Sequence, residues 1–94
     1  MPETKNLFLV TYDLNTSNQR WNNVLAFISQ YEHLRLSEST YLVEAESNTM
    51  LMFQAIKVLV DEADIFFLVQ ITQPVVGQGH KATSDWIRSK TNKH

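Results

Sequence analysis

The chain has 94 residues, a net charge of −2 and no cysteine. This length is that of a single domain, and the lack of cysteine excludes disulfides and thiolate metal sites. No apolar run approaches the roughly 20 residues that a membrane-spanning helix needs, and MPETKN at the start lacks the regions of a signal peptide, so we expect a cytoplasmic protein without membrane contact.

Charge is distributed unevenly along the chain. Residues 1–79 contain four basic and nine acidic residues, a net charge of −5, whereas residues 80–94 carry +3. An acidic body repels phosphate at long range, so it lacks the electrostatic pattern typical of a nucleic-acid-binding protein. Between the two parts, the segment PVVGQG at residues 74–79 contains one proline and both glycines of the chain, and these residue types favour turns and loops. We therefore predict a domain over residues 1–72 and a C-terminal appendage over residues 73–94 that docks on the domain or on a partner subunit.

The first predicted element is a strand over residues 6–13, because its β-branched and aromatic residues fit a pleated surface. Side chains alternate between two apolar faces, one of which ends in Asp13 and the other in Tyr12. Since both faces are apolar, we expect both to be covered in the folded protein.

Two helices are predicted further along the chain. The residues NTSN at 15–18 suit a turn and an N-cap, and apolar residues then recur at helical spacing, which predicts a helix over residues 17–32. Ser47, Asn48 and Thr49 can cap a second helix, whose apolar spacing continues to Val60. The acidic run DEAD, residues 61–64, is predicted to end this helix in a solvated loop.

Three further strands complete the predicted fold, over residues 33–36, 40–46 and 65–72. The resulting order, βαββαβ, is typical of the ferredoxin-like α+β fold. We expect a four-stranded antiparallel sheet with both helices on one face and a C-terminal tail. Right-handed crossovers place the first and third strands at the centre of this sheet and the other two at its edges.

The last strand contains IFFLV, which is apolar on both faces although it is predicted to lie at an edge. Apolar edges invite unwanted pairing and are normally covered. A second subunit or the chain's own tail can provide the cover, and we predict a homodimer packed through sheet faces or edges. In the tail, TSDWIRSK predicts a short helix that starts at Ser84 or Asp85 and docks through Trp86.

Asp13 is the first candidate for a functional role. A carboxylate at the end of a central strand that faces a two-fold axis would meet its own copy, and two such carboxylates need a cation between them. Mg²⁺ suits this arrangement because it needs only one or two carboxylates and keeps its waters, one of which can attack a phosphodiester. The alternative is that Asp13 forms an Asx turn or cap where the strand meets NTSN.

Three residues near Asp13 are candidates for substrate binding. Asn15 can orient a water or a phosphate, although short polar residues also suit any strand-to-helix turn. Arg20 lies in the first turn of the predicted helix, where a cation opposes the helix dipole, so we expect it to meet an anion, either Asp13 or a substrate phosphate. The alternative is an ion pair on the protein surface. Tyr12 points to the face opposite Asp13, which favours a place in the core over a catalytic role.

At LVTYDLN, residues 9–15, the sequence resembles the Cas-two-like small CRISPR-associated proteins, and in particular the SinR-like branch of short ferredoxin-fold proteins. The other matching pieces are Arg20, the strand STYLVEA at residues 39–45, the acidic turn before IFFLVQIT, and Trp86-Ile87. This resemblance implies a homodimer in which the first-strand aspartates face each other. Carried over by position, Asp13 is the metal ligand, with Tyr12 and Arg20 as its neighbours.

Three functions remain open from these observations, and the third, a small-ligand regulatory domain of the same fold, would require a pocket. Some members of the family are metal-dependent ribonucleases or deoxyribonucleases, and others are non-catalytic dimers that bridge partner proteins and DNA. The first function predicts a Mg²⁺-dependent endonuclease that uses paired Asp13 residues on a nucleic acid. The second predicts a dimeric interaction module with a partner protein, in keeping with the single acidic motif, the acidic body and the apolar edge.

Overall fold

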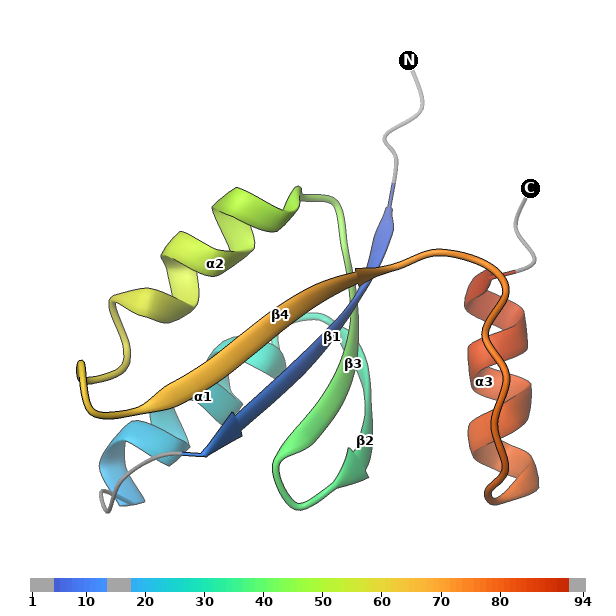
Figure 1. Ribbon diagram of the computed structural model, residues 1–94, viewed down its shortest axis with the longest axis horizontal. Helices are drawn as coiled ribbons and strands as arrows, with labels where there is room; N and C mark the ends of the chain where they lie inside the picture. Colours follow the sequence, from blue (N-terminus) through green and yellow to red (C-terminus); the bar gives the residue numbers. More distant parts are fainter. Residues whose placement is uncertain (1–4, 14–17, 92–94) are drawn as a thin grey trace.

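The computed structural model describes residues 5–13 and 18–91. The elements follow each other in the order βαββαβα (Figure 1): β1 (Asn6–Asp13), α1 (Asn18–Ile28), β2 (Glu32–Ser37), β3 (Thr40–Ala45), α2 (Thr49–Lys57), β4 (Ile65–Ile71) and α3 (Lys81–Thr91). Within this part of the chain, no helix has the length and apolar character needed to cross a membrane.

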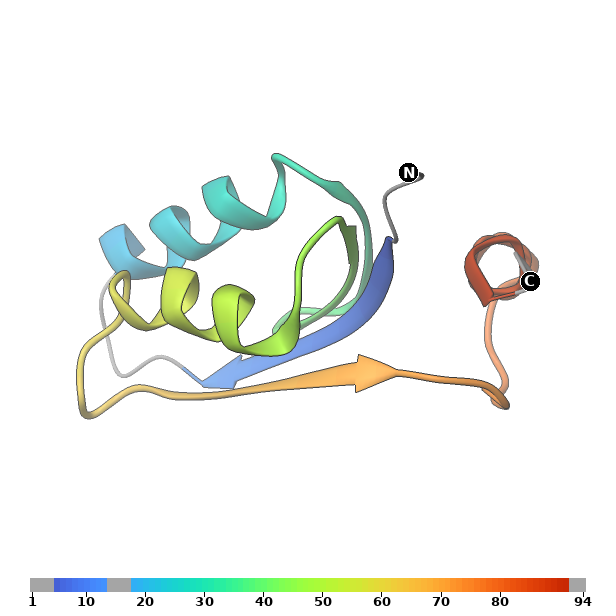
Figure 2. The same cartoon turned by 90° about the horizontal axis from the view of Figure 1, so that it is seen from above.

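The four strands form one antiparallel sheet in the order β2-β3-β1-β4. As predicted, β1 and β3 are central and β2 and β4 are the edges. Helices α1 and α2 lie side by side on one face of this sheet (Figure 2). The protein is therefore a small α+β domain whose topology is consistent with the predicted ferredoxin-like arrangement.

The core lies between the sheet and the layer of α1 and α2. The face of β1 that ends in Tyr12 points into it, because alternate residues of a strand point to opposite faces. Complete burial of one such aliphatic side chain contributes about 1.5–3 kcal/mol. The buried members of the cluster are Phe8, Val10, Tyr12, Val24, Ile28, Tyr41, Val43, Ala45, Met52 and Ile56.

Both helices of this layer end earlier than predicted. Helix α1 ends at Ile28 rather than near residue 32, and a turn in which Tyr31 N donates to Ile28 O (3.1 Å) leads into β2. Glu32, the last residue of the predicted helix, is instead the first residue of β2 and is paired with Glu44 in the sheet. The predicted start of this helix, Ser17, lies outside the described residues.

Helix α2 confirms the predicted cap, since the Asn48 side chain accepts a hydrogen bond from Leu51 N at 2.9 Å. It ends at Lys57, and the predicted remainder to Val60 is a tighter turn in which Leu59 N donates to Ile56 O at 2.9 Å. Shorter turns of this kind are common at the C-termini of helices.

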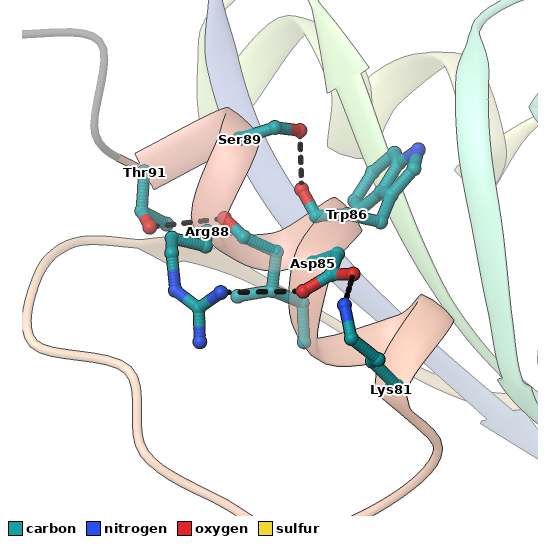
Figure 3. Close-up of polar contacts among 7 residues, drawn as sticks. Lys81, Asp85, Trp86, Arg88, Ser89 and Thr91 are labelled. Atoms are coloured by element: carbon teal, nitrogen blue, oxygen red, sulfur yellow. Dashed lines mark hydrogen bonds and ion pairs between the residues drawn. The ribbon is translucent and has the colours of Figure 1, made fainter.

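The C-terminal helix differs from the prediction in its start. It begins at Lys81, and Ser84 N donates to His80 O at 3.1 Å, so the cap position falls at His80 rather than at Ser84 or Asp85. Asp85 lies inside the helix, where it forms ion pairs with Lys81 (2.6 Å) and Arg88 (3.2 Å), as Figure 3 shows. The i,i+4 and i,i+3 spacings bring these side chains onto the same surface of the helix.

Helix α3 lies against β2 on the side of the sheet away from α1 and α2 (Figure 2). The face opposite the core, which we call the open face, is therefore covered only in part. Leu7, Leu42 and Glu44 are buried there, whereas Ile65, Phe67 and Val69 of β4 are 55%, 66% and 51% exposed. The tail thus provides part of the predicted cover, while the edge strand keeps an exposed apolar surface.

Candidate functional site

Asp13 is the last residue of β1 and is exposed on the open face. It follows Leu9 and Thr11 on this face, as the alternation in the sequence predicts. The Thr11 hydroxyl lies 3.1 Å from that of Thr40 on the neighbouring strand, which ties β1 to β3 two residues before the carboxylate. A central, paired strand thus holds the backbone of Asp13 while its side chain faces solvent.

An apolar strip runs along β4 beside this carboxylate. Ile65, Phe67 and Val69, which we call the β4 strip, are paired in the sheet with Asp13, Thr11 and Leu9, respectively. Residues paired across an antiparallel sheet lie on the same face and within contact distance. The carboxylate therefore lies at one end of an apolar surface, and α3 leaves this surface uncovered.

The oxygen donors of Asp13 are the hard ligands that Mg²⁺ prefers. In the described residues, however, no group of three or more acidic or histidine side chains is placed to hold a metal ion. A cation at Asp13 would thus need ligands from water, from a phosphate or from a second copy of the chain. The described residues therefore form no metal site in which protein side chains supply three or more of the ligands.

Arg20 lies in the first turn of α1 and pairs with Asp64, the residue before β4. Its Nε donates to Asp64 Oδ2 at 2.6 Å and its Nη2 donates to Oδ1 at 3.3 Å, so both carboxylate oxygens are engaged. The hydrogen bond with Asp64 raises the pKa of Arg20 above its ordinary value. Arg20 thus meets an anion, but the anion is the internal carboxylate of Asp64 and not Asp13, and a contact with a substrate phosphate stays a prediction.

Asp64 is a residue whose role the sequence analysis missed. Its side chain is fully buried, whereas the run DEAD was predicted to be a solvated loop. The carboxylate also accepts a hydrogen bond from Asp61 N at 2.8 Å, which closes the turn. Asp64 precedes Ile65, which pairs with Asp13 in the sheet, and it lies close to Arg20 at the start of α1. This placement depends on the register of β1 with β4, so it was not visible in the local sequence.

Tyr12 is a core residue, with 5% of its surface exposed. Its ring stacks on Tyr41 at 6.4 Å, and its hydroxyl is buried and makes no hydrogen bond with any described residue. Burial, and next the neighbouring Tyr41, raise the pKa of Tyr12 to about 12. The structure thus places Tyr12 on the opposite face from Asp13, in agreement with its predicted place in the core. Asn15 lies outside the described residues.

A second polar cluster, which the sequence analysis did not identify, joins α3 to the sheet. Lys90 Nζ forms an ion pair with Glu32 Oε2 and lies 3.3 Å from Glu44 Oε1. Burial on its own lowers the pKa of Lys90, but the hydrogen bonds to both carboxylates outweigh it, so the pKa is raised. The lysine is therefore charged, and its single positive charge lies beside two acids that no spacing along the chain connects.

Comparison with known proteins identifies the fold alone. No protein-family model matches the sequence, and no curated protein matches it either. Among solved structures, the chain is similar to a crystal structure of a hypothetical protein, TT1823, from Thermus thermophilus, with a TM-score of 0.64 and 18% sequence identity. The match covers 82% of this chain and 94% of that chain. Both chains thus share the α+β architecture over most of their length.

Proposed function

We propose that the protein is a homodimeric, Mg²⁺-dependent endonuclease of the Cas-two-like type, in which two Asp13 residues meet at the interface. The observation that carries this proposal is the position of Asp13: it is exposed, at the end of a central strand, and directly beside the apolar β4 strip. The segment LVTYDLN and its resemblance to CRISPR-associated proteins support the same proposal, as does the ferredoxin-like topology.

The dimer is proposed to form through the open face. The β4 strip exposes three large apolar side chains on one strand, and contiguous apolar surface of this kind marks interaction sites. In a two-fold dimer the same patch is used by both copies, so a residue near the axis faces its own copy. Because Asp13 borders the strip at one end, a two-fold axis that passes near this end would bring the two carboxylates together.

Two facing carboxylates repel each other unless a cation lies between them. Bound Mg²⁺ would supply a polarised water and charge stabilisation for cleavage of a phosphodiester. The chain's own part is to hold the ion through Asp13 on a rigid strand and to position the substrate. Arg20 is proposed to contact a substrate phosphate through the 27% of its side chain that is exposed, while Asp64 keeps the guanidinium in place.

The test is cleavage of labelled RNA and DNA in the presence of Mg²⁺ by the wild type and by Asp13→Asn. We expect Asp13→Asn to lose at least 100-fold in rate, a loss typical of removal of a group that acts on the reacting centre. Glu38→Gln, which neutralises an exposed acid in the turn between β2 and β3, is the matched control and should keep full activity. Equal rates for Asp13→Asn and the wild type would exclude the nuclease proposal.

A second candidate is a non-catalytic dimeric module that binds a partner protein. The observations that favour it are the acidic charge of residues 1–79 and the lack, among the described residues, of any group of three or more acidic or histidine side chains that could hold a metal ion. In this case neither the wild type nor Asp13→Asn cleaves nucleic acid, and both dimerise equally. Absence of cleavage together with an intact dimer would therefore support the module over the enzyme.

A further inference from the structure

The acids Glu32 and Glu44 lie directly opposite each other in the pairing of β2 with β3, on the open face. Like charges in such positions destabilise a sheet. The Glu44 side chain is only 4% exposed, so its charge cannot be screened by water alone. Lys90, itself 10% exposed, lies between the two acids and provides the opposite charge. The sheet thus carries a built site for one cationic side chain.

Helix α3 delivers this lysine but packs loosely in other respects. None of its side chains is fully buried. A helix of 11 residues is marginal in water by itself, so its stability depends on docking. The Trp86 ring lies on the same helix, and Lys90 Nζ is 5.4 Å from its centroid, so a cation–π contact within α3 helps to position the lysine. In Figure 3, Trp86 projects from a different side of the helix than Asp85 and its two ion-pair partners.

A groove of about 740 Å³ lies between α3 and the open face, and the connecting segment 73–79 lines it as well. The side of α3 that lines it carries Thr83, Ile87 and Thr91, which recur every four residues. The Thr91 hydroxyl bonds to Ile87 O at 2.9 Å, so it makes this bond within the helix itself (Figure 3). The sheet side of the groove forms an apolar floor that includes Leu7, Leu9, Leu42 and Ile71, and α3 brings the small polar side chains of Thr83 and Thr91 to the groove besides Ile87.

We propose that Glu32, Glu44 and this apolar floor form a docking surface for an amphipathic helix of a partner protein. Charge and shape define the partner helix: it carries a lysine for the two acids, an aromatic residue four positions before it, and large apolar side chains where α3 has threonine. Helix α3 is the chain's own, poorly fitting occupant, and the partner helix binds by displacing it. This surface is separate from Asp13 and does not depend on nuclease activity.

The test uses a fluorescent peptide with the sequence of residues 80–94 in which Thr83 and Thr91 are replaced by leucine. Its binding to the full-length chain is measured by anisotropy. In the chain variant Lys90→Glu, the helix carries a third acid toward Glu32 and Glu44, so α3 is released and no longer competes. We expect this variant to bind the peptide at least tenfold more tightly than the wild type does.

Two controls separate this proposal from a purely structural role of Lys90. The chain variant Lys81→Glu loses an ion pair from the same helix, but an exposed one, and should bind the peptide as the wild type does. A peptide that also carries Lys90→Glu should bind at least tenfold more weakly than the parent peptide. Equal binding by Lys90→Glu and wild-type chains, or equal binding of the two peptides, would overturn the proposal.

A second measurement decides the matter if Lys90→Glu fails to fold. Amide hydrogen exchange is followed in α3 of the wild-type chain while the parent peptide is added. Displacement predicts that α3 exchanges faster as the peptide concentration rises, because the released helix is marginal in water. Unchanged exchange at saturating peptide, or absence of peptide binding, would overturn the proposal. Both results are independent of any cleavage of nucleic acid.

Discussion

Replacement of Tyr12 by phenylalanine is expected to stabilise the protein. The Tyr12 hydroxyl is buried, and it makes no hydrogen bond to a described residue, although the polar groups of Trp21 and Tyr41 lie close enough to influence its pKa. A buried polar group without a partner costs about 1–3 kcal/mol. Phenylalanine keeps the stacked ring and removes this cost, so we expect a gain of about 1 kcal/mol, or about 4–8 °C in Tm for a domain of this size.

The assay is thermal and urea unfolding followed by circular dichroism. Tyr31→Phe, at a half-buried tyrosine outside the buried cluster, is the control and should change stability by less than about 0.5 kcal/mol. Loss of stability in Tyr12→Phe would refute the reasoning, because it would show that the hydroxyl has a hydrogen-bond partner.

The same residue predicts a pH dependence. Because the folded state raises the pKa of Tyr12 to about 12, from its ordinary value near 10, the folded state holds the proton more tightly than the unfolded state. This contribution to stability is complete below pH 10 and is lost as the pH rises through 12. Tyr12→Phe should therefore lose less stability than the wild type between these values, as measured by urea unfolding at each pH.

Two further substitutions test the interface and the Arg20 ion pair. Phe67→Glu places a charge in the β4 strip and should raise the dissociation constant of the dimer at least tenfold, about 1.4 kcal/mol, in sedimentation experiments; a wild type that stays monomeric at high micromolar concentration would contradict the interface. Arg20→Gln removes the guanidinium from the buried Asp64 carboxylate and should lower Tm more than Lys81→Gln, which breaks an exposed ion pair; equal effects would show that the Arg20–Asp64 pair contributes no more to stability than the exposed pair does.

Patterns along the chain were sufficient for the architecture. Alternation in β1 separates the side of Tyr12 from the side of Asp13, and the structure keeps both assignments. The Asn48 cap and the order of the strands are likewise properties of short segments and of general rules for crossovers. Helix ends were predicted less well, since apolar spacing continues past Ile28 and Lys57 while the start of β2 and a tighter turn end the helices earlier.

The ion pairs of Arg20 with Asp64 and of Lys90 with Glu32 and Glu44 could not be predicted, because each joins segments that are distant in the chain. Asp64 looked like one of several acids in a surface loop until the pairing of β1 with β4 brought it to Arg20. Glu44 looked like a solvent-facing residue of a half-buried strand until α3 covered it with Lys90. Burial and charge partners are set by the sheet register and by the docking of helices, neither of which is encoded in local spacing.

The sequence alone determined the α+β class, the central place of β1 and the face on which Asp13 lies, because periodicity, capping and crossover handedness act over a few residues at a time. Only the tertiary structure decided that α3 covers one half of the open face and leaves the β4 strip exposed. It also decided that Lys90 lies between two opposed acids. Such contacts depend on the relative placement of whole elements, where small differences in packing energy select one arrangement among several that the same local patterns allow.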